Sequence, residues 1–523
     1  MLNDILYVII FILYTVCFYH YLTFSFHMLQ LSSYHNPTHL LYENNHQRYI
    51  YAPYKVFLCL PPLMLLIGRG FFTAALILSL PVMLWFAYIS KPLKAKKPFV
   101  VTARIKRLYC AAFVLYGIVC LAAFLCPICH PSFLLALTAV FSVFIYPFTR
   151  LCNTINRPIE RSVANHYIKE ARDILKSKED MTVIGITGSY GKTSTKYFLN
   201  SILSYRFESL MTPASYNTTM GVVRTVRENL KPTTSHFVVE MGARHLGEIK
   251  EICDIVHPNM GIIASIGPQH LETFGSLDNV VKAKMELYDA VKQNGTVFLN
   301  IDSDPIYENL PTEGKIVTYG IKRTADYMAY DLSVSEMGIS FYVKTPEGET
   351  ERFTTKLLGA HNVLNILGAI SVAHKLGMSL KSMTVPVACL EAVPHRLEIK
   401  GGGENVIIDD AYNSNPIGAK AALDALNLCD GMKIIITPGM VELGDREYEL
   451  NKIFGTQIAE ICDYVCLVGA DHIYDGLTEA GFDEEKIFRT KDVREAINHA
   501  TSLKSTKNGK KYILLENDLP DNY

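Results

Sequence analysis

A glycine-rich turn near the middle of the chain most constrains its fold. Residues 184–194 read Ile-Gly-Ile-Thr-Gly-Ser-Tyr-Gly-Lys-Thr-Ser, which predicts a strand, a tight turn and then a helix over residues 194–204. Two glycines let backbone N–H groups converge on an anion, and the helix that follows adds its N-terminal dipole. Lys192 supplies a mobile cation, and Thr193 supplies a hydroxyl group for Mg²⁺. The turn therefore predicts a site for a nucleoside triphosphate.

The spacing of this turn departs from the usual G-x-x-x-x-G-K-[ST] pattern. Ile186 stands where the first glycine is expected, which leaves a shorter T-G-x-x-G-K-T-S form. A chance glycine turn is the alternative interpretation, but the strand at 183–186 and the helix after the turn provide the context that a phosphate site requires. The predicted phosphate-binding residues are Gly188, Ser189, Gly191, Lys192, Thr193 and Ser194.

The apolar residues are distributed unevenly along the chain. With 523 residues the chain has room for several domains, and its net charge of −1 gives no reason to expect nucleic acid as a partner. Residues 1–150 hold most of the long apolar runs and few acids, whereas residues 151–523 have the mixture of a soluble α/β protein. We therefore expect a membrane region followed by soluble domains.

Within residues 1–150, four stretches are long and apolar enough to cross a bilayer, since about 20 apolar residues span the hydrocarbon core. They are residues 5–24, 71–90, 109–128 and 132–148, with a marginal fifth at 56–68. The first stretch follows no basic segment and precedes no small-residue cleavage site, so we expect it to remain as an anchor.

A cluster of cations predicts the orientation of the membrane region. Seven lysines and arginines between residues 91 and 107 place this loop in the cytoplasm by the positive-inside rule, and two more spans return the chain to the same side. The prediction is a multi-pass protein of the cytoplasmic (inner) membrane whose catalytic domains lie in the cytosol. The outer turn, residues 126–130, reads Cys-Pro-Ile-Cys-His, a pattern that also occurs where haem is attached; free thiols or a local disulfide are the favoured interpretation.

The remaining sequence predicts a connecting helix and two α/β domains. Residues 151–180 have apolar residues at helical spacing. Residues 181–393 alternate short apolar strands with helices, which predicts a parallel sheet covered on both faces in a central P-loop-type ATPase domain. The strands are expected at 183–186, 237–240, 261–265 and 297–300, with an antiparallel flap over 315–356. A smaller Rossmann-like domain follows over 394–523, with strands at 406–409, 434–438 and 464–468.

Several further motifs occur along this region in a fixed order. They are Thr-Pro-Ala-Ser-Tyr-Asn at 212–217, Val-Glu-Met-Gly-Ala at 239–243, His-Leu-Glu at 270–272, Lys-Ala-Lys-Met-Glu at 282–286, Gly-Ala-His-Asn-Val-Leu-Asn at 359–365 and Asp-Asp-Ala-Tyr-Asn-Ser-Asn-Pro at 409–416. Together with the glycine-rich turn, this order resembles the Mur ligases over roughly residues 181–500. Within that family it is most similar to the UDP-N-acetylmuramoyl-tripeptide D-alanyl-D-alanine ligases.

The resemblance implies an ATP-dependent amide ligase that acts through an acyl phosphate. A carboxylate is a poor electrophile, so it must be activated, and the transferred phosphoryl group needs concentrated positive charge. Lys192 would lie on the β- and γ-phosphates, while Thr193 and Glu240 would hold Mg²⁺. Glu240 ends a predicted strand, where sites form in α/β sheets, although an acid there can also be a surface residue.

Other site residues come from the resemblance alone. It implies that His270 helps to hold a second Mg²⁺ and that Lys284 is carbamylated into a metal ligand, which with Lys192 gives three catalytic candidates. From residue type alone, a single histidine such as His270 is more often structural, and Lys282 and Lys284 are solvated helix lysines. The remaining nucleotide-binding candidates are Asn300, His361, Asn362 and Asn365 from the central domain and Arg396, Asp410 and Tyr412 from the last domain, which would close over the nucleotide and exclude water.

The chain also departs from the family in two places. Membrane spans stand where the soluble relatives have the domain that holds the UDP-sugar, and the end of the chain, Leu-Leu-Glu-Asn-Asp-Leu-Pro at 514–520, lacks the expected Lys-Gly-Ser-Arg-like segment. We therefore expect a membrane-associated, lipid-linked carboxylate acceptor of the cell envelope, such as a peptidoglycan precursor, and an amino acid or dipeptide as the amine. A membrane-tethered polyglutamate-type ligase is one alternative. An ATP-driven transporter or sensor is another, which the scarcity of charged residues within the spans disfavours.

Overall fold

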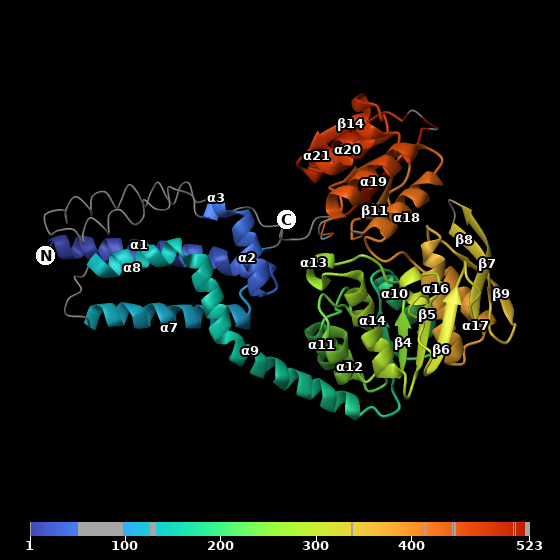
Figure 1. Cartoon of the computed structure of the whole chain (residues 1–523), viewed down its shortest axis with the longest axis horizontal. Helices are drawn as coiled ribbons and strands as arrows, with labels where there is room; N and C mark the ends of the chain where they lie inside the picture. Colours follow the sequence, from blue (N-terminus) through green and yellow to red (C-terminus); the bar gives the residue numbers. More distant parts are fainter. Residues whose placement is uncertain are drawn as a thin grey trace. The chain divides into compact units, whose positions relative to one another are not determined.

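The computed structural model divides into two compact units, with the boundary along the chain between Asn165 and His166 (Figure 1). It describes residues 2–50, 98–125, 132–335, 338–412, 415–441, 443, 446–505, 507 and 509–517. The predicted spans at 56–68 and 71–90, residues 91–97 of the cationic loop and the Cys-Pro-Ile-Cys-His turn therefore lie outside the described residues.

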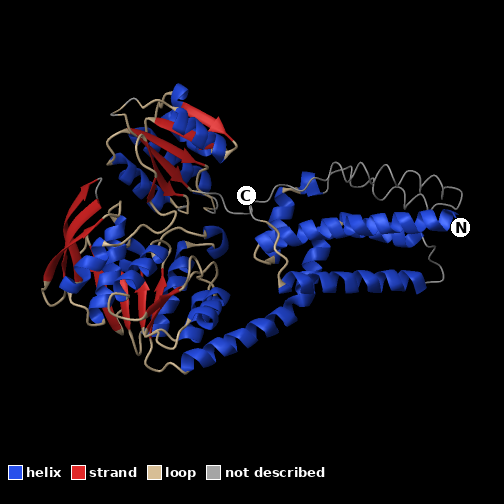
Figure 2. Ribbon diagram, turned by 180° about the vertical axis from the view of Figure 1, so that it is seen from behind, coloured by secondary structure: helices blue, strands red, loops and turns tan. Residues whose placement is uncertain are grey.

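The first unit is helical in its described part. Its helices are α1 (Leu2–Leu31), α2 (Asn36–Asn45), α3 (Gln47–Ile50), α7 (Ala103–Leu125), α8 (Ser132–Val143) and the beginning of α9 (Ile145–Lys176). Figure 2 shows α1, α7 and α8 running side by side. Their shared core is aromatic and aliphatic, with Phe18 of α1 stacked on Tyr116 of α7 at 4.8 Å between ring centroids.

The boundary between the last predicted span and the connecting helix differs in the structure. The span expected at 132–148 ends as α8 at Val143, and α9 runs without interruption from Ile145 through the expected boundary to Lys176. Pro147 explains the break, because it has no N–H to donate to the carbonyl of Val143 and its ring crowds that carbonyl. The two expected elements are therefore divided at residue 144 and not near 150.

The surface of this unit is strongly apolar. Val16 of α1 and Val114, Ile118 and Leu121 of α7 are each more than half exposed. Among the fully described residues, one helix is long and apolar enough by itself to cross a membrane, at Ala103–Ala122, six residues before the predicted span at 109–128. The helix α1 covers the predicted span at 5–24, but several of its side chains lie outside the description. Multiple spans therefore stay a prediction.

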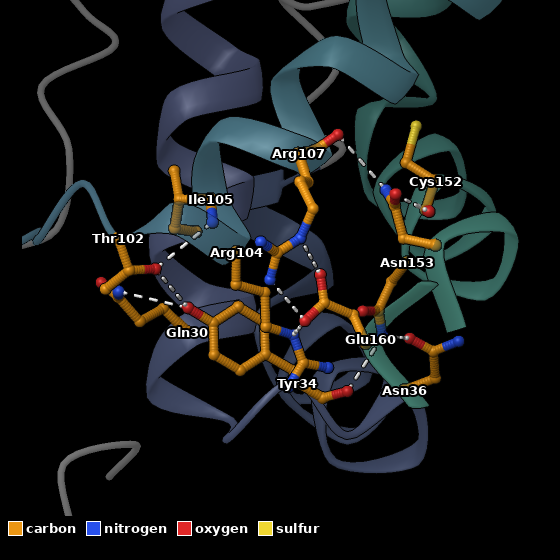
Figure 3. A network of polar contacts seen from close by, with 11 residues as sticks. Gln30, Tyr34, Asn36, Thr102, Arg104, Ile105, Arg107, Cys152, Asn153 and Glu160 are labelled. Carbon is orange, nitrogen blue, oxygen red and sulfur yellow. Dashed lines mark hydrogen bonds and ion pairs between the residues drawn. The ribbon is translucent and has the colours of Figure 1, made fainter. Parts of the chain in front are cut away.

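Polar side chains gather at one end of this helical unit (Figure 3). Arg107 of α7 donates to both carboxylate oxygens of Glu160 in α9, at 2.6 and 2.8 Å, and Arg104 lies over the ring of Tyr34 at 3.9 Å. Asn153 of α9 donates to the carbonyl oxygen of Tyr34 at 2.9 Å. These contacts tie α7 and α9 to the end of α1.

The second unit begins with a nine-stranded sheet. Its order is β2-β3-β1-β4-β5-β6-β7-β8-β9, and neighbouring strands are parallel as far as β7. The bounds are β1 (Thr182–Thr187), β2 (Ser209–Met211), β3 (His236–Glu240), β4 (Met260–Ile263), β5 (Thr296–Asn300), β6 (Lys315–Gly320), β7 (Tyr327–Ser335), β8 (Gly338–Lys344) and β9 (Thr350–Thr355). This confirms the expected α/β class with a parallel sheet.

The antiparallel flap expected within this domain over residues 315–356 is confirmed for its last three strands and wrong for β6. Only β7, β8 and β9 are antiparallel to one another, while β6 pairs in parallel with β5 and carries the same sheet onward. The sheet stays continuous because Val317 and Tyr319 of β6 join the apolar core beneath it.

Helices cover both faces of this sheet, as the continuous apolar strands predict. On one face, α10 (Lys192–Leu203), α16 (His361–Lys375) and α17 (Leu380–Ala388) pack on Ile184 and Ile186 of β1. On the other face, α11 (Thr219–Asn229), α12 (Glu248–Val256) and α14 (Leu277–Val291) pack on Val183. Short helices α13 (Leu271–Phe274) and α15 (Asp304–Tyr307) follow β4 and β5.

A six-stranded sheet completes the second unit, in the order β10-β11-β15-β12-β13-β14. Its strands are β10 (Glu398–Lys400), β11 (Asn405–Asp410), β12 (Met432–Thr437), β13 (Tyr464–Val468), β14 (Ile487–Thr490) and β15 (Lys511–Glu516). The helices α18 (Pro416–Asn427), α19 (Glu447–Ile461) and α20 (Asp471–Glu479) cover one face, α21 (Val493–Ser502) covers the other, and a 3₁₀ turn spans Glu484–Lys486. Only β10 is antiparallel to its neighbour, so this part is also α/β.

Candidate functional site

The glycine-rich turn connects β1 directly to α10. Gly188 and Gly191 have φ angles of 149° and 78°, which L-residues other than glycine rarely adopt. A Cβ atom on Gly191 would lie 2.4 Å from Oδ1 of Asn365, so the turn also packs closely on α16. The helix begins at Lys192, two residues earlier than predicted, because Gly191 forms its N-cap.

Lys192 is the first residue of α10, and its side chain folds back onto the glycine-rich turn. Its Nζ donates to the carbonyl oxygens of Gly188 and Ser189 at 2.7 and 2.9 Å. Burial lowers the pKa of Lys192 to about 8; Glu240 opposes this shift and Arg396 adds to it. The ammonium group therefore stands beside the loop backbone, where it can meet a phosphate.

Glu240 stands at the end of β3 and is the centre of a buried polar cluster. Its Oε1 accepts hydrogen bonds from Thr193 Oγ1 and Asn217 Nδ2, both at 3.1 Å. Its Oε2 lies 3.0 Å from Nζ of Lys196, one helical turn after Lys192. Only 1% of the Glu240 side chain is exposed, so its charge is balanced inside the protein.

Thr193 and Glu240 suit a magnesium ion in donor type and spacing. Both offer the hard oxygen atoms that Mg²⁺ prefers. Octahedral coordination at about 2.1 Å separates adjacent ligand atoms by about 3 Å, close to the 3.1 Å between Thr193 Oγ1 and Glu240 Oε1. These two residues could therefore hold neighbouring positions on one ion.

A cavity of about 310 Å³ lies in front of this cluster, a size typical of small-molecule sites. Central-domain residues and residues that follow position 394 both line it. Of the predicted residues, it brings together Ser189, Gly191, Lys192, Thr193, Ser194, Glu240, His270, Asn300, His361, Asn362, Asn365, Arg396, Asp410 and Tyr412. Two predicted residues, Gly188 and Lys284, do not line it.

Lys284 lies close behind the cavity wall. It projects from α14, is 2% exposed, and has its Nζ 5.7 Å from the centre of the Phe274 ring. Burial lowers its pKa to about 7, and the nearby positive charge of Lys192 adds to that shift. Lys284 is therefore not the solvated helix lysine that residue type alone suggests.

The α16 residues and Asn300 are fixed by bonds within the protein. Asn362 Nδ2 donates to the carbonyl oxygen of Leu358 at 2.7 Å, and Thr195 Oγ1 donates to Asn365 Oδ1 at 3.4 Å. Asn300 Nδ2 donates to the carbonyl oxygen of Ala264 at 2.6 Å. These amides therefore orient the loops around the cavity, and Asn365 does so from directly behind the glycine-rich turn.

Arg396 reaches the cavity from a strained turn. The residues on both sides of it, His395 and Leu397, have positive φ angles of 60° and 48°. His395 is held by Asp409, with Nδ1 and Oδ2 2.8 Å apart, and Leu397 donates its N–H to Asp410 Oδ1 at 3.1 Å. Strain of this kind persists where surrounding contacts hold the backbone, here the bonds of His395 and Leu397 on either side of Arg396.

Comparison with known proteins accounts for this arrangement. Residues 186–373 match the Mur ligase middle domain, and residues 395–515 match the Mur ligase glutamate ligase domain. This part of the chain belongs to the Mur ligase family. The relationship recognised in the motif order is thereby confirmed.

Two curated relatives of this chain are ligases with the same name. The UDP-N-acetylmuramoyl-tripeptide–D-alanyl-D-alanine ligase of Bacillus subtilis is 32% identical over 280 residues, covering 53% of this chain and 60% of the relative. That of Escherichia coli is 30% identical over 301 residues, covering 55% and 66%. The chain thus spans less than two thirds of the length of either relative.

Solved structures of Mur ligases agree with this assignment. MurF from Acinetobacter baumannii has a TM-score of 0.61 and 27% identity, covering 69% of this chain and 78% of that one. MurF from Thermotoga maritima, solved in complex with ADP, has a TM-score of 0.59 and 25% identity, covering 68% and 80%.

Several residues of this Mur ligase site were missed from the sequence. Lys196 repeats at i+4 after Lys192, which places both on one face of α10, and Asn217 ends the 212–217 motif. Their spacing was visible, but their contact with Glu240 depends on how β3 packs beside α10. Tyr190, Ser215, Gln269, Asn415 and Ile417 also line the cavity without having been predicted.

Proposed function

We propose that this protein is an ATP-dependent ligase that joins a carboxylate to an amine through an acyl phosphate. The observation that supports it most directly is the grouping of Lys192, Thr193, Glu240, Arg396 and Asp410 around one cavity. This places two cations and a magnesium-compatible oxygen pair where a triphosphate can lie.

The chemistry has two steps. A carboxylate oxygen of the acceptor attacks the γ-phosphorus of ATP, the bond to the bridging oxygen breaks, and ADP leaves. The amine then attacks the acyl carbon, inorganic phosphate leaves with the electron pair of its C–O bond, and the amine loses a proton. Lys192 and Arg396 stabilise the charge on the phosphoryl oxygens during transfer. Mg²⁺, held by Thr193 and Glu240, would neutralise further phosphate charge.

Lys284 and His270 are proposed as ligands of a second Mg²⁺. An amine must be neutral to react with CO₂, and the pKa of about 7 for Lys284 leaves a substantial neutral fraction at physiological pH. Its carbamate would present a carboxylate-like group close to Lys192. His270, at the N-cap of α13, lines the same cavity and is proposed to share a second Mg²⁺ with it.

We propose a cell-envelope precursor at the membrane as the acceptor and an amino acid or dipeptide as the amine. The named relatives are ligases of a UDP-muramoyl tripeptide and D-alanyl-D-alanine. In this chain the family match begins at residue 186, and a helical unit with an apolar surface precedes it. Attachment to a bilayer would concentrate a lipid-linked acceptor near the cavity.

The proposed location is the cytoplasmic membrane, with the α/β unit in the cytosol. The span at Ala103–Ala122 and the exposed apolar side chains of α1 and α7 favour it, because water-exposed apolar patches of this extent are rare on soluble proteins. Recovery of the chain in the soluble fraction after cell lysis would contradict this location.

The deciding experiment incubates purified full-length protein in detergent with ATP and Mg²⁺, and with soluble or lipid-linked muramoyl tripeptide. Each acceptor is combined with single amino acids or D-alanyl-D-alanine, and products are identified by mass spectrometry. We expect amide product and equal amounts of ADP and phosphate only when acid and amine are both present. ATP hydrolysis that ignores both substrates would contradict a ligase.

Two other functions give different results in the same assay. A polyglutamate-type ligase would add one amino acid repeatedly, which produces a ladder of equal mass increments. An ATP-driven transporter or sensor would hydrolyse ATP without forming an amide and would respond to a transported solute or a signalling partner.

A further inference from the structure

Lys196 is buried directly behind the nucleotide-binding turn. Its side chain has no exposed surface, and its Nζ lies 3.0 Å from Oε2 of Glu240 and also donates to the carbonyl oxygen of Ala214. It does not line the cavity. Lys196 therefore makes no direct contact with a ligand in the cavity and acts on it through Glu240 and through its charge.

The carboxylate of Glu240 is divided between two sets of partners. Oε2 forms an ion pair with Lys196, whereas Oε1 accepts hydrogen bonds from Thr193 and Asn217 on the side of the cavity. Lys196 thus fixes which oxygen is presented. A buried carboxylate without such a partner would carry a large desolvation cost.

The formal charges around this carboxylate add to a positive value. Glu240 contributes one negative charge and Lys196 cancels it, while Lys192 lies near enough to Glu240 to interact with it electrostatically. Arg396 adds a further cation that interacts with Asp410 and with Glu240. Asp410 lines the same cavity and adds a second negative charge, so three cations face two anions and the net charge is +1. A divalent cation entering alone therefore meets net repulsion, whereas a triphosphate would bring the missing negative charge.

We infer that Lys196 is a positioning residue that prevents Glu240 from capturing a free divalent cation and restricts the site to a cation carried by nucleotide phosphates. The inference rests on the proposed nucleotide site. Lys196 presents Oε1 in a fixed orientation and keeps the Glu240–Lys196 pair neutral. The cation then binds tightly only when phosphate oxygens share it, which couples metal binding to nucleotide binding.

The test measures cation binding and not turnover. Mn²⁺ serves as the probe for the divalent site, and its binding to purified full-length protein is followed by electron paramagnetic resonance with and without a non-hydrolysable ATP analogue. In the native protein we expect weak binding of Mn²⁺ alone and strong binding with the analogue. In Lys196→Met, we expect the affinity for Mn²⁺ alone to rise at least about tenfold, because a charge near the site is lost.

Two controls separate charge from structure. Lys196→Arg retains the cation and should retain the native preference, and Lys250→Met removes an exposed lysine that pairs with Asp254 on α12 and should change nothing. If Lys196→Met does not fold, as judged by circular dichroism, the double variant Lys196→Met with Glu240→Gln removes both charges. It should bind Mn²⁺ weakly in both conditions.

The outcomes also distinguish this inference from the function on which it rests. Strong nucleotide-dependent Mn²⁺ binding, with unchanged binding of Mn²⁺ alone in Lys196→Met, overturns the role of Lys196 and leaves the nucleotide site intact. If the analogue does not promote Mn²⁺ binding in the native protein, the proposed function itself fails.

Discussion

The two units of this protein place their charged and apolar groups in opposite ways. In the helical unit, valine and isoleucine side chains of α1 and α7 face outward, while Arg107 and Glu160 pair within it. In the α/β unit, apolar side chains fill both faces of two sheets, and charged groups gather around a cavity. Charged residues therefore join helices in one unit and line a cavity in the other.

The two arrangements suit different surroundings. Apolar surface in water is unfavourable, so a unit that exposes it requires a lipid or protein partner, whereas its buried ion pairs hold the helices together. A water-facing unit buries its apolar surface and can keep charged groups at the edge of a sheet, where a ligand meets them. The comparison predicts that charge removal has different consequences in the two units.

The largest expected effect is loss of activity; some stability is also lost, because buried Lys196 keeps its charge without a carboxylate partner. Glu240→Gln retains the size and hydrogen-bonding capacity of the side chain but removes its charge, so we expect phosphate release to fall on the order of a thousandfold. The rate is measured with both substrates and saturating Mg²⁺. Glu228→Gln, an exposed acid on α11 that pairs with Arg224, is the matched control. A near-native rate for Glu240→Gln would remove this carboxylate from the mechanism.

In the helical unit, charge removal should cost stability alone. Glu43 of α2 pairs with Arg150 of α9, and both are largely buried. Glu43→Ala leaves the arginine without this partner. We therefore expect the free energy of unfolding, measured in mixed detergent micelles, to fall by about 3 kcal/mol. Nucleotide binding by the α/β unit should not change.

A double variant checks that the loss comes from the unpaired charge. Glu43→Met combined with Arg150→Met removes both charges and should recover most of the stability. Equal losses in the single and double variants would show that packing, and not the ion pair, is what matters at this position.

An exposed apolar residue of the helical unit tests the opposite side of the comparison. Ile118 of α7 is 58% exposed. Ile118→Arg should reduce membrane insertion of α7 by about 2.5 kcal/mol if the residue faces the centre of a bilayer. Glycosylation mapping of the full chain measures the inserted fraction, with Ile118→Leu as the apolar control. Equal insertion of the two variants would argue that α7 does not span the membrane.

The smallest expected effect concerns pH. Burial lowers the pKa of His361 from 6.5 to about 4, with Arg396 adding to the shift. Between pH 6.5 and 4 the unfolded chain therefore binds a proton that the folded chain does not, so this residue makes stability fall as pH decreases. At pH 5.5 the contribution is about 1 kcal/mol.

His361→Gln should flatten this part of the stability profile, measured by urea unfolding of the full chain from pH 7 to 5. His472→Gln, an exposed residue of α20, serves as the control. An unchanged slope in His361→Gln would show that the buried imidazole does not govern acid sensitivity.

Much of the α/β unit could be predicted because its signals are local. The strand expected at 464–468 coincides with β13, and β1 extends the expected 183–186 by one residue at each end. Short apolar runs between glycines and helices identify parallel strands well. The expected flap at 315–356 was wrong in part, since alternation along a strand does not say which neighbour it pairs with.

The candidate site was predicted less completely. The glycine-rich turn and Glu240 were found because each stands in a recognisable motif, and Arg396 was found from the family resemblance; the structure brings them to one cavity. Lys196 was missed because nothing near it in the sequence shows that its partner lies 44 positions later, on β3. The division between α8 and α9 was also misplaced, although Pro147 was available to mark it.

The sequence by itself determined the elements that depend on neighbouring residues: the phosphate-binding turn, the alternation of strands and helices, and the apolar character of the first unit. Only the tertiary structure decided which distant groups meet, namely Lys196 with Glu240, and Arg396 with the cavity in front of β3. The physical reason is that backbone preference and periodicity act over a few residues, whereas the balance of a buried charge depends on the packing of elements far apart in the chain.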